Sequence, residues 1–265
     1  MAMDIPSNLT GSDCQRTLVL AKEEIKTKGK PQYWGLLFFR PEVLMYVMRK
    51  LINITFTGID RYTNPQDLWE IQNKWPKTEF GILFSQDWSE NGIRYPDPKD
   101  LQKFKGLNLS AHLCGQIARE AARGQWKPAL EVLGDSLNLF KRIQINVPTA
   151  TFVGIRPGQR SQEIIQQRQW PEDIDFSPVF EGFSVLLDAS GGRGIPALPV
   201  ATGYRGKIGY AGGIGPDNVV SVIKAAEAIQ EDGEYWIDME TKVRDSQDHF
   251  SPDLIKEVLT QIWPS

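Results

Sequence analysis

Eight short apolar runs recur from residue 53 to residue 238, and each ends in glycine or near a polar residue. The runs are 54–58, 80–84, 107–113, 142–146, 151–155, 183–187, 207–211 and 234–238. Helical patterns accompany them at 64–75, 98–104, 115–123, 129–138, 161–168, 216–230 and 252–262. Strands that alternate with helices pair in parallel through right-handed crossovers. Eight such strands favour closure into a (β/α)8 TIM barrel, whose active site lies at the carboxyl ends of its strands.

One connection departs from this rhythm. Pro148 leaves only a short link between the fourth and fifth runs, so the helical segment 129–138 belongs to the third crossover. Before the first run, residues 13–28 and 41–51 have helical patterns. We therefore expect an N-terminal helical extension over residues 1–50, packed on a single barrel domain over residues 51–265.

Size, charge and cysteine content narrow the class of protein. With 265 residues, the chain is long enough for an eight-fold barrel, which needs roughly 250. The net charge of −3, with both signs scattered, argues against a nucleic-acid partner. No apolar stretch reaches the ~20 residues that span a bilayer, so no membrane partner is expected. Cys14 and Cys114 fit neither a metal motif nor a disulfide framework, and a secretory leader is not evident. These features indicate a cytoplasmic protein.

Asp188 is the strongest single candidate for catalysis. It follows the apolar residues 185–187, which places its carboxylate at the barrel mouth beside low-dielectric walls. Burial of this kind raises the pKa of a carboxyl group and suits a general acid. The competing interpretation is a carboxylate that pairs with Arg193 or caps the following turn.

Glycines follow the seventh run. Gly212, Gly213 and Gly215 allow close backbone approach, and a helix that begins near Asn218 would point free amides at an anion. Phosphate sites in TIM barrels gather behind strands seven and eight, which favours an anion cradle. A tight turn in which glycine serves geometry alone is the alternative.

His112 and Cys114 bracket the end of the third run and share a face while the chain is extended. They are candidates for a base and a nucleophile, or for metal ligands together with Asp188 or Glu240. A buried hydrophobic cysteine and a histidine that satisfies a backbone group are the structural alternatives. We favour His112 as a catalytic group and expect no metal and no cofactor.

Further polar residues follow other runs and would ring the same mouth if the barrel closes. Ordinary loop solvation is the alternative for the first of these groups, which comprises Asn146, Arg156, Ser85 and Asp87. The second group alternates along one strand end, so its two acids and two bases could neutralise each other; it comprises Asp238, Glu240, Lys242 and Arg244. From these groups we favour Asn146, Glu240 and Arg244 as pocket contacts.

The last ninety residues resemble phosphoribosylanthranilate isomerase, a barrel enzyme of tryptophan biosynthesis. The sixth strand of that family ends in a Leu-Leu-Asp run and a glycine-rich loop, as residues 186–194 do here. Its seventh strand has an Ala-Gly-Gly run that leads into a helix start, as residues 211–219 do. The resemblance implies an acid at Asp188 and phosphate contacts at five residues: Gly191, Gly192, Arg193, Gly212 and Gly213.

Two departures from the family concern its chemistry. Thr57 stands where the family has its cysteine general base, and a threonine hydroxyl cannot take a proton at neutral pH without help. Glu240 stands in the segment whose backbone amides help to hold the phosphate in the family, where its charge would repel an anion, although Lys242 or Arg244 could supply positive charge. These departures argue against orthodox isomerase activity on phosphoribosylanthranilate.

Together these features predict a divergent barrel enzyme, an isomerase or lyase, that acts by proton transfer on a small anionic, phosphorylated metabolite. Asp188 would be the acid, with His112, Thr57 or Glu240 as its partner. The alternative is a non-catalytic barrel that binds a ligand or a protein partner, because a fold alone is no evidence of activity. An oligomer is compatible with either prediction.

Overall fold

The computed structural model describes residues 51–87, 92–147, 162–167, 184–188, 196, 198–200, 206–229 and 233–264. The chain divides into two compact units, Met1–Met48 and Arg49–Ser265, and the described residues belong to the second. The helical extension predicted for residues 1–50 therefore lies outside the described residues.

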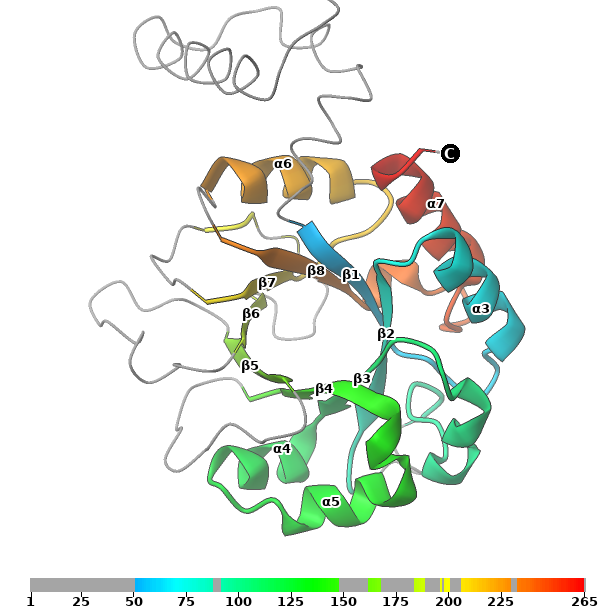
Figure 1. Cartoon of the computed structure of the whole chain (residues 1–265), viewed down its shortest axis with the longest axis vertical. Coiled ribbons are helices and arrows are strands. Elements are labelled where there is room, and N and C mark those ends of the chain that lie inside the picture. Colours follow the sequence, from blue (N-terminus) through cyan, green and yellow to red (C-terminus); the bar gives the residue numbers. More distant parts are fainter. Residues whose placement is uncertain are drawn as a thin grey trace, which may run out of the picture. The chain divides into compact units, whose positions relative to one another are not determined.

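Eight parallel strands form a closed barrel in chain order, with β8 paired to β1 (Figure 1). The strands are β1 (Leu51–Thr57), β2 (Thr78–Phe84), β3 (Leu109–Leu113), β4 (Phe140–Ile145), β5 (Gln162–Gln167), β6 (Ser184–Asp188), β7 (Ile208–Ala211) and β8 (Tyr235–Met239). Because every pair is parallel, all eight carboxyl ends lie at the same end of the barrel. The parallel α/β architecture predicted from the sequence is confirmed.

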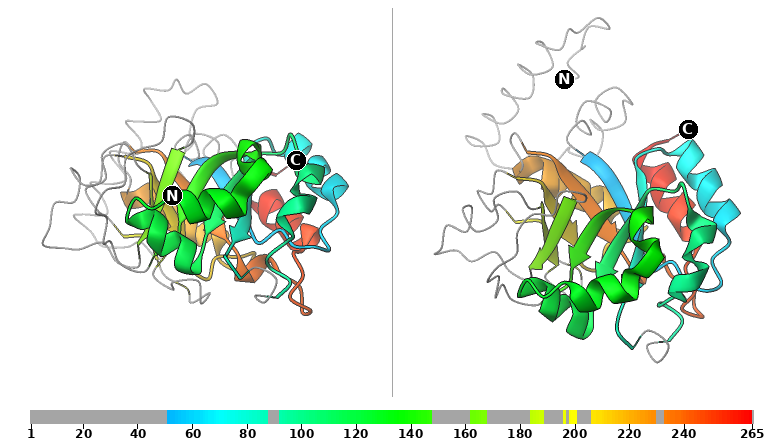
Figure 2. Two further views of the ribbon diagram at one scale, coloured as in Figure 1. Left: turned by 90° about the horizontal axis from the view of Figure 1, so that it is seen from below. Right: turned by 60° about the horizontal axis from the view of Figure 1, so that its bottom comes forward.

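The helices of the described residues lie on the outside of the ring of strands (Figure 1). The α-helices are α3 (Pro65–Lys74), α4 (Gly115–Ala122), α5 (Lys127–Leu133), α6 (Val219–Ile229) and α7 (Pro252–Ile262). Three 3-10 helices accompany them: η1 (Pro98–Phe104), η2 (Gly134–Leu139) and η3 (Thr241–Val243). Helices α4 and α5 lie side by side on one flank, as Figure 2 also shows. Within the described part of the chain, no helix combines the length and apolarity that crossing a membrane requires.

Local sequence signals explain where two of these helices begin. At α3, the side chain of Asn64 accepts a hydrogen bond from the backbone N–H of Gln66, and Pro65 occupies the first turn. At α7, Ser251 caps the backbone N–H of Leu254. The predicted ranges 64–75 and 252–262 agree with these two helices.

The fifth strand corrects the sequence prediction. A helix was expected over 161–168, but residues 162–167 form β5, which pairs with β4 on one side and β6 on the other. Ile164 and Ile165 are β-branched and suit a strand, and ladder hydrogen bonds along both edges outweigh the weak helix propensity of the surrounding Gln and Glu. The strand predicted at 151–155 lies outside the described residues, as do most residues that connect β4 to β7.

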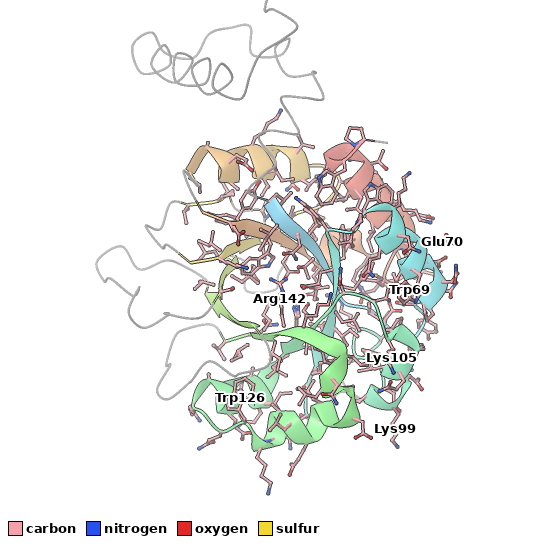
Figure 3. All side chains as sticks on the ribbon, in the orientation of Figure 1. Trp69, Glu70, Lys99, Lys105, Trp126 and Arg142 are labelled. Atoms are coloured by element: carbon pink, nitrogen blue, oxygen red, sulfur yellow. The ribbon has the colours of Figure 1, made fainter. Side chains whose placement is uncertain are left out.

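The interior of the barrel contains several buried polar and charged side chains. Along β1, Ile54 and Phe56 face the helices, whereas Thr55 and Thr57 face inward. The inward direction follows from Thr55, whose hydroxyl donates to Glu79 of β2 and accepts from Arg142 of β4. Figure 3 shows Arg142 inside the ring of strands.

Candidate functional site

A hydrogen bond joins the ends of the first and last strands. Thr57 donates from Oγ1 to Oδ1 of Asp238 over 2.7 Å, and both residues are buried. Burial raises the pKa of Asp238 to about 8, the hydrogen bond from Thr57 lowers it in part, and the charge of Glu240 raises it further. Thr57 is thus coupled to a carboxyl group that is mostly protonated at neutral pH.

His112 is enclosed next to this pair. Its Nε2 lies 3.0 Å from Oγ of Ser110, and its Nδ1 lies 3.0 Å from Nε2 of Gln144. Burial, followed by the positive charge of Arg142, lowers the pKa of His112 to about 3. The imidazole is therefore neutral at physiological pH and is a weak base.

Gly81 makes room for both groups. A Cβ atom at this position would lie 2.5 Å from Oγ1 of Thr57 and 2.9 Å from Nε2 of His112. The packing of Thr57 and His112 therefore requires a glycine at this position.

Cys114 lies at the barrel mouth, partly exposed, and its Sγ accepts a hydrogen bond of 3.4 Å from Nδ2 of Asn146. Burial raises the pKa of the thiol to about 11, although the hydrogen bonds from Asn146 and Tyr95 lower it in part. A protonated thiol is a poor nucleophile and a poor metal ligand. Among the described residues, no group of three or more His, Cys, Asp or Glu side chains is arranged to hold a metal ion.

Two carboxyl groups lie at the mouth: Asp188 ends β6, and Glu240 directly follows β8. Burial raises the pKa of Glu240, the charges of Arg94 and Arg244 lower it in part, and the charge of Asp188 adds a smaller increase. Asp188 itself is 4% exposed. The position predicted for Asp188, beside low-dielectric walls at the strand end, agrees with this burial.

Arg94 reaches the same mouth from the segment after β2. Its Nη1 donates to Oε1 of Glu240 over 2.8 Å, and its Nε and Nη2 donate to the two carboxylate oxygens of Asp248 over 2.9 and 2.6 Å. The guanidinium is only partly buried. It therefore brings a positive charge next to Glu240 in addition to the charges of Lys242 and Arg244 that were expected from the sequence.

Arg244 holds the loop after β8 against the end of β1. Its guanidinium pairs with Asp60 over 2.9 Å, with both side chains 1% exposed. It also donates to the carbonyl oxygens of Gly58 and Asp248, and the same Asp60 carboxylate accepts from the backbone N–H of Phe250. These contacts favour a structural role for Arg244, and its predicted role as a ligand contact remains untested.

The glycine turn after β7 has the left-handed conformations that glycine permits, with φ of 106° at Gly212 and 59° at Gly213. The side chain of Asn218 closes the turn, since its Oδ1 accepts from the N–H of Gly215 and its Nδ2 donates to the carbonyl of Gly213, both over 2.9 Å. Lys242 lies beside this turn, 3.6 Å from Asp217. The geometry agrees with the tight-turn interpretation, and the anion cradle stays a prediction.

Several predicted site residues therefore gather at one end of the barrel. These are Asp188, His112, Thr57, Glu240, Asn146, Gly212 and Gly213. Four others, Gly191, Gly192, Arg193 and Arg156, lie outside the described residues.

The sequence analysis passed over Arg94 and Tyr95 and did not choose Asp238. Asp238 had a usable signal, because it follows the apolar residues 235–237 much as Asp188 follows its own run. Arg94 had none, since nothing in an irregular segment tells which residue turns toward the mouth.

Comparison with known proteins shows similarity in structure only. No protein-family model matches the chain, and no curated protein matches it in sequence. Phosphoribosyl anthranilate isomerase from Thermococcus kodakaraensis is 15% identical with a TM-score of 0.49, over 81% of this chain and all of that one. The enzyme of the same name from Thermotoga maritima is 16% identical with a TM-score of 0.50, over 80% of this chain and 98% of that one. The resemblance inferred from the sequence thus holds for the fold: the chain has the α/β barrel fold of phosphoribosyl anthranilate isomerase.

Proposed function

We propose that this chain is a (β/α)8 barrel enzyme, an isomerase or lyase, that transfers protons on a small anionic, phosphorylated metabolite. One observation carries the proposal. Asp188, which is 4% exposed at the end of β6, and Glu240, which follows β8, both lie at the end of the barrel where enzymes of this fold have their active sites. Burial raises the pKa of Glu240, and a carboxyl group with a raised pKa in such a position is typical of acid–base catalysis.

Each group has a role in this proposal. Asp188 is the acid that donates a proton to the substrate. In the structure, Arg94 is ion-paired with Glu240 and Asp248. When the substrate binds, Arg94 releases one of these carboxylates and pairs with an anionic group of the substrate instead. The turn at Gly212 and Gly213, together with Gly191, Gly192 and Arg193, which lie outside the described residues, would hold the phosphate.

The non-catalytic alternative is favoured by the state of the basic groups at the mouth. Arg94 and Arg244 are both paired with carboxylates of the protein, and His112 is a weak base. A barrel of this kind would bind a ligand or a protein partner without changing it.

A panel of sugar phosphates separates these possibilities. The protein is heated with ribose 5-phosphate, ribulose 5-phosphate, glyceraldehyde 3-phosphate or inorganic phosphate, and the shift in Tm is measured. A ligand at 100 times its Kd stabilises the folded state by about 2.7 kcal/mol. Each compound is then incubated with the protein in D2O, and the loss of carbon-bound protons is followed by NMR.

We expect at least one sugar phosphate to stabilise the protein and to exchange a proton. Asp188→Asn should abolish the exchange and retain binding, whereas the control Asp135→Asn changes an exposed carboxylate of η2, ahead of β4 and so toward the opposite end of the barrel. Binding without exchange by the unaltered protein would support the non-catalytic alternative. If no compound binds, the proposal is wrong.

A further inference from the structure

Asp238 lies in the barrel interior between two charged layers. Trp236, Asp238 and Glu240 alternate along one strand and its end, so they share the inward face. Arg142 stacks over the ring of Trp236 at 5.0 Å and pairs with Glu79, which forms the layer nearer the amino ends of the strands. Glu240 and Arg94 form the layer at the mouth. Asp238 is thus the first carboxyl group beneath the mouth layer on β8.

The other candidate bases of the site are poorly suited to accept a proton. His112 has both ring nitrogens within hydrogen-bonding distance of protein groups, and the pKa of the Cys114 thiol is raised to about 11. The hydroxyl group of Thr57 already donates a hydrogen bond to Asp238. The hydroxyl that stands where the family has its base is therefore hydrogen-bonded to the carboxyl group of Asp238.

One oxygen of Asp238 is available for chemistry. Within the described part of the chain, the hydrogen bond that the Asp238 carboxyl group makes is the one that its Oδ1 accepts from Thr57, and the residue keeps 6% of its surface exposed. A carboxylate that is held at one oxygen and open at the other has a fixed orientation, which is what proton abstraction from a bound substrate requires.

We propose that Asp238, positioned by Thr57, is the catalytic base of this barrel and works with Asp188 as the acid. This inference rests on the proposed function. Oδ2 of Asp238 takes a proton from a carbon next to a carbonyl or imine of the substrate, and the electron pair moves into the substrate to form an enol or enamine. Asp188 supplies a proton to the heteroatom, so no net charge, oxidant or reductant is involved.

The electrostatic surroundings suit this role. Burial raises the pKa of Asp238 to about 8, which keeps it close to physiological pH and makes its ionised form a stronger base than an exposed carboxylate. The groups that act on it are Thr57 of β1, Glu79 of β2, Arg142 of β4 and Glu240 after β8. Thr57 and Arg142 favour the ionised form of Asp238, whereas the two glutamates disfavour it.

An epoxide that carries a phosphate group tests the proposal without a known substrate. The probe is 2,3-epoxypropyl phosphate. A carboxylate oxygen attacks the terminal epoxide carbon and forms an ester, the ring C–O bond breaks, and the resulting alkoxide takes a proton from water. Peptide mass spectrometry then locates the ester, and its rate of formation is measured against pH.

We expect the ester on Asp238, with a rate that rises as this carboxyl ionises and that falls when inorganic phosphate competes. Asp238→Asn should lose at least nine tenths of the label at this peptide. Thr57→Val removes the hydrogen bond, so the midpoint of the pH profile should move to higher pH, whereas Thr57→Ser should restore the original midpoint. Circular dichroism of each variant verifies that it is folded.

Three outcomes would overturn the inference. An ester on Asp188 or Glu240 alone would remove Asp238 as the base and leave an anion-binding site, in support of the proposed function. A pH profile that stays unchanged in Thr57→Val would remove the positioning role of Thr57. No ester at all would overturn the inference, and the exchange assay in D2O then decides the proposed function separately.

Discussion

Arg142 of β4 and Glu79 of β2 form an ion pair across β3 inside the barrel. Nε of Arg142 donates to Oε2 of Glu79 over 2.8 Å, and both side chains are less than 10% exposed. Thr55 bridges the pair, because it accepts from Nη2 of Arg142 and donates to Oε1 of Glu79, each over 3.1 Å. The barrel interior is thus filled at this level by a hydrogen-bonded polar network and not by apolar side chains alone.

Breaking this pair should destabilise the protein strongly. Glu79→Gln leaves the guanidinium of Arg142 buried without a counter-charge, which typically costs about 3–5 kcal/mol. Urea unfolding followed by circular dichroism measures the loss. The double variant Glu79→Met, Arg142→Met removes both charges and should recover much of it. A loss below about 1 kcal/mol in Glu79→Gln would contradict the importance of the pair.

Gly209 of β7 is required by the packing of Trp236. A Cβ atom at this position would lie 2.2 Å from Cε2 of Trp236 and 2.6 Å from Cδ1 of Leu186. Gly209→Ala should therefore lower the free energy of unfolding by ~1–3 kcal/mol, as overpacking does in other cores. Urea denaturation provides the value.

A second substitution tests the cause. Trp236→Leu removes the ring that meets the added methyl group, so Gly209→Ala should cost less in the Trp236→Leu background than alone. If the two losses simply add, the steric explanation is wrong.

Arg244 should prove to be a structural residue. Arg244→Met leaves Asp60 buried beside Gly58 without its charged partner, and we expect a loss of about 3–5 kcal/mol in unfolding free energy. The matched control is Arg61→Met, which alters an exposed arginine of the neighbouring segment and should change stability little. A stable Arg244→Met that no longer binds sugar phosphates would instead support the ligand contact predicted from the sequence.

The sequence predicted the strands well where pattern alone decides. Apolar runs that end in glycine or carboxylate identify β1, β6, β7 and β8 to within a few residues, because a strand of a barrel needs a buried face toward the helices. The same pattern did not identify residues 162–167 as a strand. Their Gln and Glu favour a helix locally, and only pairing with β4 and β6 makes them a strand.

For the site, positions along the chain could be predicted from the sequence, but the partners of the side chains could not. Asp188, Glu240 and Asn146 could be placed at strand ends from their neighbours in sequence. The bond between Thr57 and Asp238 joins residues 181 positions apart, and its existence depends on closure of β8 against β1. The ion pair between Arg244 and Asp60 could not be predicted either, because Asp60 lies in a loop that no periodic pattern describes.

Cys114 should react slowly with alkylating reagents. Because its pKa is raised to about 11, only a small fraction of the thiol is ionised near neutral pH, and the thiolate is the reactive form. In a Cys14→Ser background, iodoacetamide should modify Cys114 at least about a hundredfold more slowly than it modifies free cysteine, whose pKa is about 8.5. Unfolding in urea should restore the ordinary rate. Fast modification of the folded protein would show that the thiol is activated and would revive its role as a nucleophile.

The stability of the protein should fall between about pH 4 and pH 8 because of Asp238. Its folded-state pKa, about 8, lies above the unfolded value of about 3.9, so the folded state binds more protons in this window. The stabilisation is complete below the unfolded pKa and is lost as pH rises through the folded pKa. Glu240 acts in the same direction, since burial raises its pKa too. Urea unfolding at several pH values should give a decline that is smaller in Asp238→Asn, and an equal decline in both proteins would show that Asp238 titrates normally.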